Sequence, residues 1–187
     1  NNVKDYFQQG SSISNSLQVA GSSRMMNARL SITRENVKGI VPNSSLAKTA
    51  AGFSAGATVN EKLTLGATGQ YVQNGGVNRP ENGYTEGNPF MTFTWFGRQV
   101  DVQSLKGKYF NTSGSPYGLA SGSLYNWNDN YHRNPYWQQY DNPAPDSRER
   151  FIGQINANYV FSSWLSGLVR AGNDSWRNVA EEHRTEL

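Results

Sequence analysis

The chain contains no cysteine, and its hydrophobic content is low for a protein of 187 residues. The absence of cysteine excludes a disulfide framework and thiolate chemistry. Hydrophobic residues make up 36% of the chain, whereas soluble globular domains contain about 45–50% when glycine is included. We therefore do not expect a large soluble core. Because aromatic residues account for 12% of the chain, the composition favours strands that bury one face over a disordered chain.

Three further features are missing from the sequence. No apolar run approaches the roughly 20 residues of a transmembrane helix, which excludes helical membrane proteins and leaves β-barrels open. The opening segment shows neither an initiator Met nor a secretory signal, so we expect the chain to begin partway through a longer protein. The formal net charge is only +3 and the basic residues are scattered, so no nucleic-acid partner is predicted.

The residue types that usually carry catalysis or metal binding are sparse. The two histidines, His132 and His183, are isolated from each other. The run from Asn126 to Asn130 offers oxygen atoms but lacks the spaced carboxylates of a calcium-binding loop, so turn formation is the preferred interpretation. The sequence therefore predicts that the protein is not an enzyme, with no catalytic residues, no metal site and no cofactor.

The sequence is rich in strict two-residue alternation. From Phe151 to Phe161, apolar residues such as Ile155 share one face of a strand, and polar residues such as Asn156 share the other. The same pattern recurs in three pairs of segments, each pair joined by a short turn. The predicted strands cover approximately residues 12–20, 27–35, 49–59, 62–73, 151–161 and 164–174.

The length and connection of these strands predict a transmembrane antiparallel β-barrel. Strands in soluble proteins have about 5–6 residues, whereas membrane-spanning strands need about 9–11. The turns within pairs are short, but the connections between pairs are long, at residues 36–48 and approximately 75–150. Outer-membrane barrels have short periplasmic turns and long extracellular loops. We therefore expect an all-β chain in which about six barrel strands accompany one long extracellular loop.

The long loop has its own sequence signals. Asn88 followed by Pro89 predicts the start of a short helix that ends by Gly97, and a second short helix is predicted from Asp101 to Gly107. Beyond them, aromatic residues alternate with amides and prolines, a mixture that suits stacking on sugars or holding a peptide. The alternative is that the loop packs on itself through the same aromatics. The candidate ligand or lid contacts are Tyr125, Trp127, Tyr131, Tyr136, Trp137 and Tyr140.

Several segments, taken in order, resemble the SusC/RagA family of TonB-linked outer-membrane transporters of Bacteroidota. The resemblance extends over nearly the whole chain and is carried by "VKDYFQQG", "RLSITRENVKGIVPNSS", "EKLTLGATGQYV", "NPFMTFTWFGRQVD", "NPYWQQYDN" and "ERFIGQINANYVFSSWLSGLVRAGND". It implies a barrel of about 22 strands, of which this chain, 1–187, would form part of a single domain from the first third.

The resemblance also implies a function. The expected function is TonB-dependent import of glycans or peptides across the bacterial outer membrane, with a SusD-like lipoprotein as an extracellular lid. The expected partners are therefore this lipoprotein, the TonB complex, the lipid bilayer and the oligomeric nutrient. The plug and the TonB-box of the family would lie outside this chain. Two alternatives stay open at the level of the sequence: a soluble carbohydrate-binding β-sandwich and a passive porin.

Overall fold

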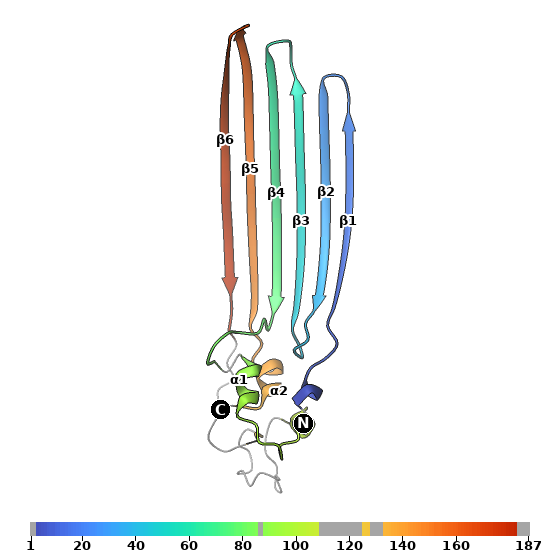
Figure 1. Cartoon of the computed structure of the whole chain (residues 1–187), viewed down its shortest axis with the longest axis vertical. Helices are drawn as coiled ribbons and strands as arrows, with labels where there is room; N and C mark the ends of the chain where they lie inside the picture. Colours follow the sequence, from blue (N-terminus) through green and yellow to red (C-terminus); the bar gives the residue numbers. More distant parts are fainter. Residues whose placement is uncertain (1–2, 86–87, 109–124, 128–132, 183–187) are drawn as a thin grey trace.

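A computed structural model describes residues 3–85, 88–108, 125–127 and 133–182 of the chain. It contains one six-stranded antiparallel sheet in which every strand pairs with its neighbour in sequence (Figure 1). The predicted all-β fold and the six predicted strands are confirmed. The strands are β1 Ser11–Ser22, β2 Met26–Lys38, β3 Ser45–Thr58, β4 Leu63–Val77, β5 Pro145–Ser162 and β6 Leu165–Ala180.

The strands are longer than the alternation predicts, and most of the extra length lies at the end away from the short turns. β5 has 18 residues and begins at Pro145, six positions before the predicted start. β2 continues to Lys38 and β3 begins at Ser45, so the predicted 36–48 connection shrinks to residues 39–44. The cause is that apolar and polar residues do not alternate regularly in these extensions: residues 146–150 of β5 are all polar, and Val37 of β2 pairs with Leu46 of β3 among polar neighbours. Backbone pairing continues there, but no hydrophobic alternation marks it.

The three short turns lie where the sequence places them. In the turn between β3 and β4, the side-chain oxygen of Asn60 accepts hydrogen bonds from the backbone N–H groups of Lys62 and Leu63, both at 2.9 Å. An asparagine that binds the backbone two residues on is a standard turn former. This local bond fixes the register of the two flanking strands.

Each short turn lies farther along the strand direction than the one before it, from the β1–β2 turn to the β5–β6 turn (Figure 1). Gly56 lies in the same row as Ser22, the end of β1, and β3 continues two residues beyond it. Asn158 lies in the same row as Thr58, the end of β3, and β5 continues four residues further.

This stagger defines a strand tilt. The offset between the turn-side ends of the strands averages about 1.5 residues, or about 5 Å, per strand, and neighbouring strands lie about 4.8 Å apart. A membrane plane drawn through the turns would therefore cross strands tilted by about 45° from its normal. Closed barrels have tilts of about 35–45°, so the sheet has the stagger that a barrel wall needs.

Four short helical segments lie at the other end of the sheet (Figure 1). They are η1 Val3–Tyr6, α1 Pro89–Thr94, η2 Val102–Leu105 and α2 Pro135–Tyr140. We call the described parts of residues 3–10, 39–44 and 78–144 the loop assembly. The buried hydrophobic residues that the structure describes all belong to this assembly and none to a strand.

Two of these helical segments were predicted and two were not. Asn88 caps α1 with Pro89 at its first position, as expected, but the helix ends at Thr94, before the predicted Gly97. The second prediction is a 3₁₀ helix, capped by Asp101 and ending at Leu105. In the described part of the chain, no helix has the length and apolar character to cross a membrane.

Candidate functional site

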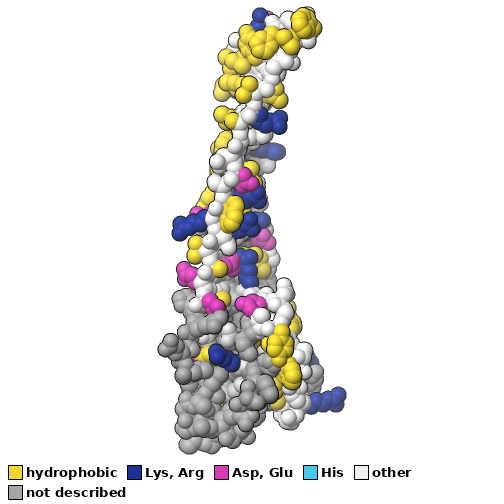
Figure 2. Space-filling model, turned by 90° about the vertical axis from the view of Figure 1, so that its left-hand side faces the viewer, with side chains coloured by type: hydrophobic (Ala, Val, Ile, Leu, Met, Phe, Trp, Pro, Cys, Tyr) yellow, Lys and Arg dark blue, Asp and Glu magenta, His cyan; other side chains and the backbone are white. Residues whose placement is uncertain are grey.

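The two faces of the sheet differ sharply in chemistry. The register places most of the large apolar side chains of the six strands on one face, which we call the apolar face, whereas Ile152, Leu168 and Trp176 lie on the other. Ile155 is 62% exposed there and Val169 is 73% exposed. In the side view of Figure 2, hydrophobic side chains gather toward the end with the short turns. Other members of this face are Leu17, Val19, Leu30, Ile32, Phe53, Leu65, Tyr71, Phe151 and Tyr159.

The apolar face ends abruptly in a polar row. Tyr71 and Phe151 lie opposite each other at its lower border, and the next pair on the same face is Gln73 and Glu149. The amide of Gln73 donates a hydrogen bond to the Glu149 carboxylate at 3.4 Å. The remaining members of this polar row are Asn15, Arg34, Thr49 and Arg177. An aromatic border followed at once by charge is the pattern found at a membrane–water interface.

The opposite border of the apolar face is also aromatic. The rings of Tyr159 and Phe161 meet edge to face with centroids 4.9 Å apart, and Trp164 in the adjoining turn is 82% exposed. Ten residues separate Phe151 from Phe161, which is about 33 Å along a strand. At a tilt of about 45° this corresponds to a height of about 23 Å, close to the roughly 25 Å of an outer-membrane barrel's apolar band.

The opposite, polar face carries amides, hydroxyls and ion pairs. Asn156 lies on it, next to Gly66. Arg150 makes a two-pronged bond to the Asp174 carboxylate, with nitrogen–oxygen distances of 2.9 and 2.6 Å. The Arg148 guanidinium lies over the Trp176 ring, 5.7 Å from its centroid. This chemistry suits a water-filled or protein-filled interior.

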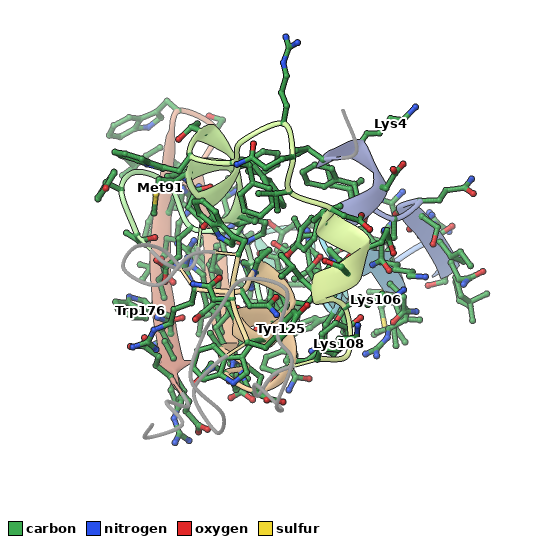
Figure 3. The ribbon with its side chains drawn as sticks, turned by 90° about the horizontal axis from the view of Figure 1, so that it is seen from below. Lys4, Met91, Lys106, Lys108, Tyr125 and Trp176 are labelled. Carbon is green, nitrogen blue, oxygen red and sulfur yellow. The ribbon has the colours of Figure 1, made fainter. Side chains whose placement is uncertain are left out.

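Most of the predicted contact residues that the structure describes are buried in the loop assembly. Tyr125 and Tyr136 belong to its hydrophobic core, and Trp137 is fully buried. Seen from the loop end, Tyr125 lies in the interior of the assembly, whereas Lys4 points away from it (Figure 3). These three side chains hold the loop together, which is the self-packing alternative that the sequence left open.

The other three predicted contacts lie differently. Trp127 is partly buried and packs against Phe96, with ring centroids 4.6 Å apart. Tyr140 is 43% exposed, which makes it the most accessible of the five predicted residues that are described. Tyr131 lies outside the described residues, and so do His132 and His183. Tyr140 is therefore the member of this set that a ligand or lid can reach most directly.

Two residues that the sequence analysis did not single out organise the loop assembly. Tyr6 is 2% exposed and packs its ring on Phe93 and Tyr136, and its hydroxyl donates to the Pro135 carbonyl at 3.3 Å. Asn134, with no exposed surface, caps α2. The Asn-Pro dipeptide at 134–135 repeats the Asn-Pro signal at 88–89, so this helix was detectable from the sequence. The contact of Tyr6 with residues some 130 positions away was not.

Burial also keeps the hydroxyls of Tyr6 and Tyr136 in their neutral, protonated form. It raises the pKa of the Tyr6 hydroxyl far above its usual value, and the neighbouring Tyr136 and Tyr140 add to the rise. Burial likewise raises the pKa of Tyr136, partly offset by its hydrogen bond with Gln103. Both hydroxyls therefore stay protonated at physiological pH and act as neutral hydrogen-bond partners.

A polar cavity of about 390 Å³ opens between the loop assembly and the ends of β4, β5 and β6. Its lining includes Arg79 after β4, Gln138 and Gln139 on α2, and Glu182 after β6. Arg79 is held in place by an ion pair with Asp146 at 2.5 Å. Within the described ranges, no group of three or more metal-ligating side chains occurs.

Comparison with known proteins does not assign the chain to a family. No protein-family model matches the chain, and no curated protein is similar enough to match it. The resemblance to the SusC/RagA family therefore rests on the sequence segments quoted above.

Proposed function

We propose that this chain forms part of the wall of a β-barrel in a bacterial outer membrane. The observation that carries the proposal is the apolar face, which is continuous over six strands and bounded by aromatic and polar rows. In water, such a face would have to be covered by another part of the protein. Lipid acyl chains cover it without any packed core.

The lengths of the strands and the stagger of the turns support the same proposal. The shortest strand has 12 residues and the longest has 18, whereas strands of soluble proteins have about 5–6. A soluble carbohydrate-binding sandwich would need a second sheet on the apolar face, and its strands need neither this length nor the stagger. The polar face then lines the lumen of the barrel.

We further propose that the barrel is an active importer of glycans or peptides, driven by TonB and assisted by a SusD-like lipoprotein. Support for this step comes from the resemblance of the sequence segments to SusC/RagA transporters. The loop assembly supplies a folded surface at the expected extracellular end, on which a lid can rest. We propose no catalytic role, and no cofactor.

The orientation in the membrane can be tested with trypsin on intact cells that lack the lid lipoprotein. Lys106 and Lys108 are exposed in the loop assembly, and Arg24 and Lys62 are exposed in two of the short turns. We expect cleavage at Lys106 or Lys108 in intact cells, and at Arg24 or Lys62 only after the outer membrane has been opened. Cleavage at the two turns in intact cells would reverse the proposed orientation.

Energised import can be separated from passive diffusion by an uptake experiment. Cells with and without the protein are given labelled oligosaccharides or labelled oligopeptides, in the presence or absence of a protonophore. We expect protein-dependent uptake of at least one pool, and loss of that uptake when the proton gradient is dissipated or TonB is deleted. Uptake that survives both treatments would identify a passive porin instead.

A further inference from the structure

The apolar face is not evenly covered by large side chains. A groove of about 710 Å³ crosses it near the short turns. The register places one small residue from each of four neighbouring strands side by side along its floor. These residues are Gly21, Ala28, Ala55 and Ala67. A Cβ atom added at Gly21 would meet no other atom within 4 Å, so the groove is open at this end.

Larger side chains border the groove on both sides. The border toward the loop assembly is formed by Val19, Leu30 and Phe53, which are all exposed. The border toward the short turns includes Met26 and Leu65, which are exposed as well. A flexible apolar chain lying between these borders would contact the floor and both sides at once.

The groove runs from the edge of the apolar face to its middle. Gly21 is one residue from the end of β1, whereas Ile155, in the same row, is seven residues from the end of β5. Four strand spacings of about 4.8 Å make this row about 19 Å long. At about 45° to the membrane normal, the row descends about 14 Å, a little over half of the roughly 25 Å apolar band. One lipid tail also covers about half of the bilayer, so the groove has the length and the slope of a single tail.

The end of the groove at the β1–β2 turn is polar and positively charged. Ser22 and Ser23 line it, and the exposed Arg24 follows them. No carboxylate lies between β1 and β2, and the next turn carries Glu61 and Lys62, whose charges balance. A guanidinium group and hydroxyls are good donors to a phosphate. A cationic headgroup finds no partner in the β1–β2 turn, so the charge favours a lipid with a net negative headgroup.

We propose that this groove holds one tail of an anionic phospholipid of the periplasmic leaflet, with its phosphate at Arg24. The proposal rests on the proposed barrel wall and adds a specific lipid partner to it. The affinity of a protein surface for a lipid grows with the apolar area buried and with the attraction to an anionic headgroup. Both contributions meet at this groove.

Photo-crosslinking of the purified full-length protein in detergent micelles tests the proposal. The probe is phosphatidylglycerol with a diazirine in the middle of one tail, and the comparator is phosphatidylcholine with the same tail. We expect the phosphatidylglycerol probe to label residues 49–79, which include Ala55 and Ala67, at least fivefold more than the other strands of the barrel. We expect the comparator to label the same segment at least threefold less.

Matched variants separate the groove from the rest of the apolar face. Ala55→Leu fills the groove and keeps the surface apolar, so labelling of residues 49–79 should fall at least fivefold. Ala51→Leu makes the same change on the same face of β3 but outside the groove, and it should label like the unaltered protein. Arg24→Gln should lower the labelling at least threefold, whereas Lys62→Gln, in the next turn, should not.

Even labelling over the apolar face, equal labelling by the two lipids, or equal effects within either matched pair of variants would overturn the proposal. Arg24→Gln changes only a turn residue, so its comparison with Lys62→Gln holds even where Ala55→Leu prevents assembly. Heat-modifiable mobility of the same preparations reports on the barrel itself. A folded barrel without selective labelling would reject the lipid site and leave the barrel wall standing, whereas a protein that never gives a folded band would reject both.

Discussion

Replacing Ile155 with arginine is expected to prevent stable assembly of the barrel. Ile155 lies near the middle of the apolar face and is 62% exposed, so in a barrel wall its side chain contacts lipid near the bilayer midplane. An arginine on the lipid side at that depth costs on the order of 2–4 kcal/mol. The measurement is heat-modifiable mobility on gels after outer-membrane extraction, in which folded and unfolded barrels migrate differently.

The neighbouring position provides the control. Asn156 lies on the polar face, and the residues across from it on β4 and β3 are Gly66 and Gly56. These glycines leave room for a long side chain, and Arg170 already occupies the same row. Asn156→Arg should therefore assemble almost normally and change transport more than folding. Equal tolerance at the two positions, or damage confined to Asn156→Arg, would show that the two faces have been assigned the wrong way round.

The faces of the strands could be predicted because each depends on local alternation alone. A period of two puts Ile155 and Asn156 on opposite sides wherever the strand pairs, and a register slip would expose the whole apolar set to the polar side. The turn at Asn60 was predictable for the same reason, because its hydrogen bonds reach only two and three residues along the chain. Features that depend on a few adjacent residues are the ones that sequence patterns capture.

The ends of the strands could not be predicted in this way. From Pro145 to Arg150, β5 carries polar residues on both faces, yet its backbone pairs with β4 and β6 without interruption. Hydrophobic alternation marks only the part of a strand that has an apolar face, and it ends where the residues on both faces are polar. The pairing there follows from the neighbouring strands.

The role of the loop aromatics was the least predictable part of the candidate site. Trp137 and Tyr140 lie on the same short helix, three residues apart, yet one is fully buried and the other is 43% exposed. Tyr136, on the same helix, packs its ring against Tyr6, which arrives from the far end of the sequence. Composition identified an aromatic-rich loop, but only the tertiary contacts separate side chains that hold the loop from those that a ligand can reach.

Asn134 illustrates how much of the loop assembly depends on one side chain. Its side-chain nitrogen donates to the carbonyl groups of Leu105, Lys108 and Tyr125, at 3.0 to 3.1 Å. Its side-chain oxygen accepts from the backbone N–H groups of Tyr136 and Trp137, which caps α2. This one amide therefore joins the η2 region, the Tyr125 segment and α2.

Substituting aspartate for Asn134 is expected to loosen the loop assembly without unfolding the sheet. The oxygen acceptors of the cap remain, but the donor is lost, and a carboxylate faces three carbonyl oxygens in a buried site. Leaving buried groups unsatisfied costs about 1–3 kcal/mol each, so we expect a loss of at least about 3 kcal/mol. Amide hydrogen exchange in the loop assembly should accelerate about 100-fold or more, since each 1.4 kcal/mol is a factor of ten. Exchange in the strands should change little.

The pH dependence and a second cap distinguish this explanation from general damage. Burial disfavours the charged form and raises the pKa of the introduced carboxyl in the folded state. The destabilisation is therefore full above that pKa and shrinks as the pH falls through it, because the protonated carboxyl donates one hydrogen bond again. Asn88→Asp is the matched control, since Asn88 also caps a helix but its amide donates to one exposed carbonyl, that of Gly83. Aspartate is as good an N-cap as asparagine, so the exchange rates around α1 should hardly change. Similar acceleration in both variants, or acceleration by Asn134→Asp that does not diminish at low pH, would show that the buried donor is not what holds the assembly.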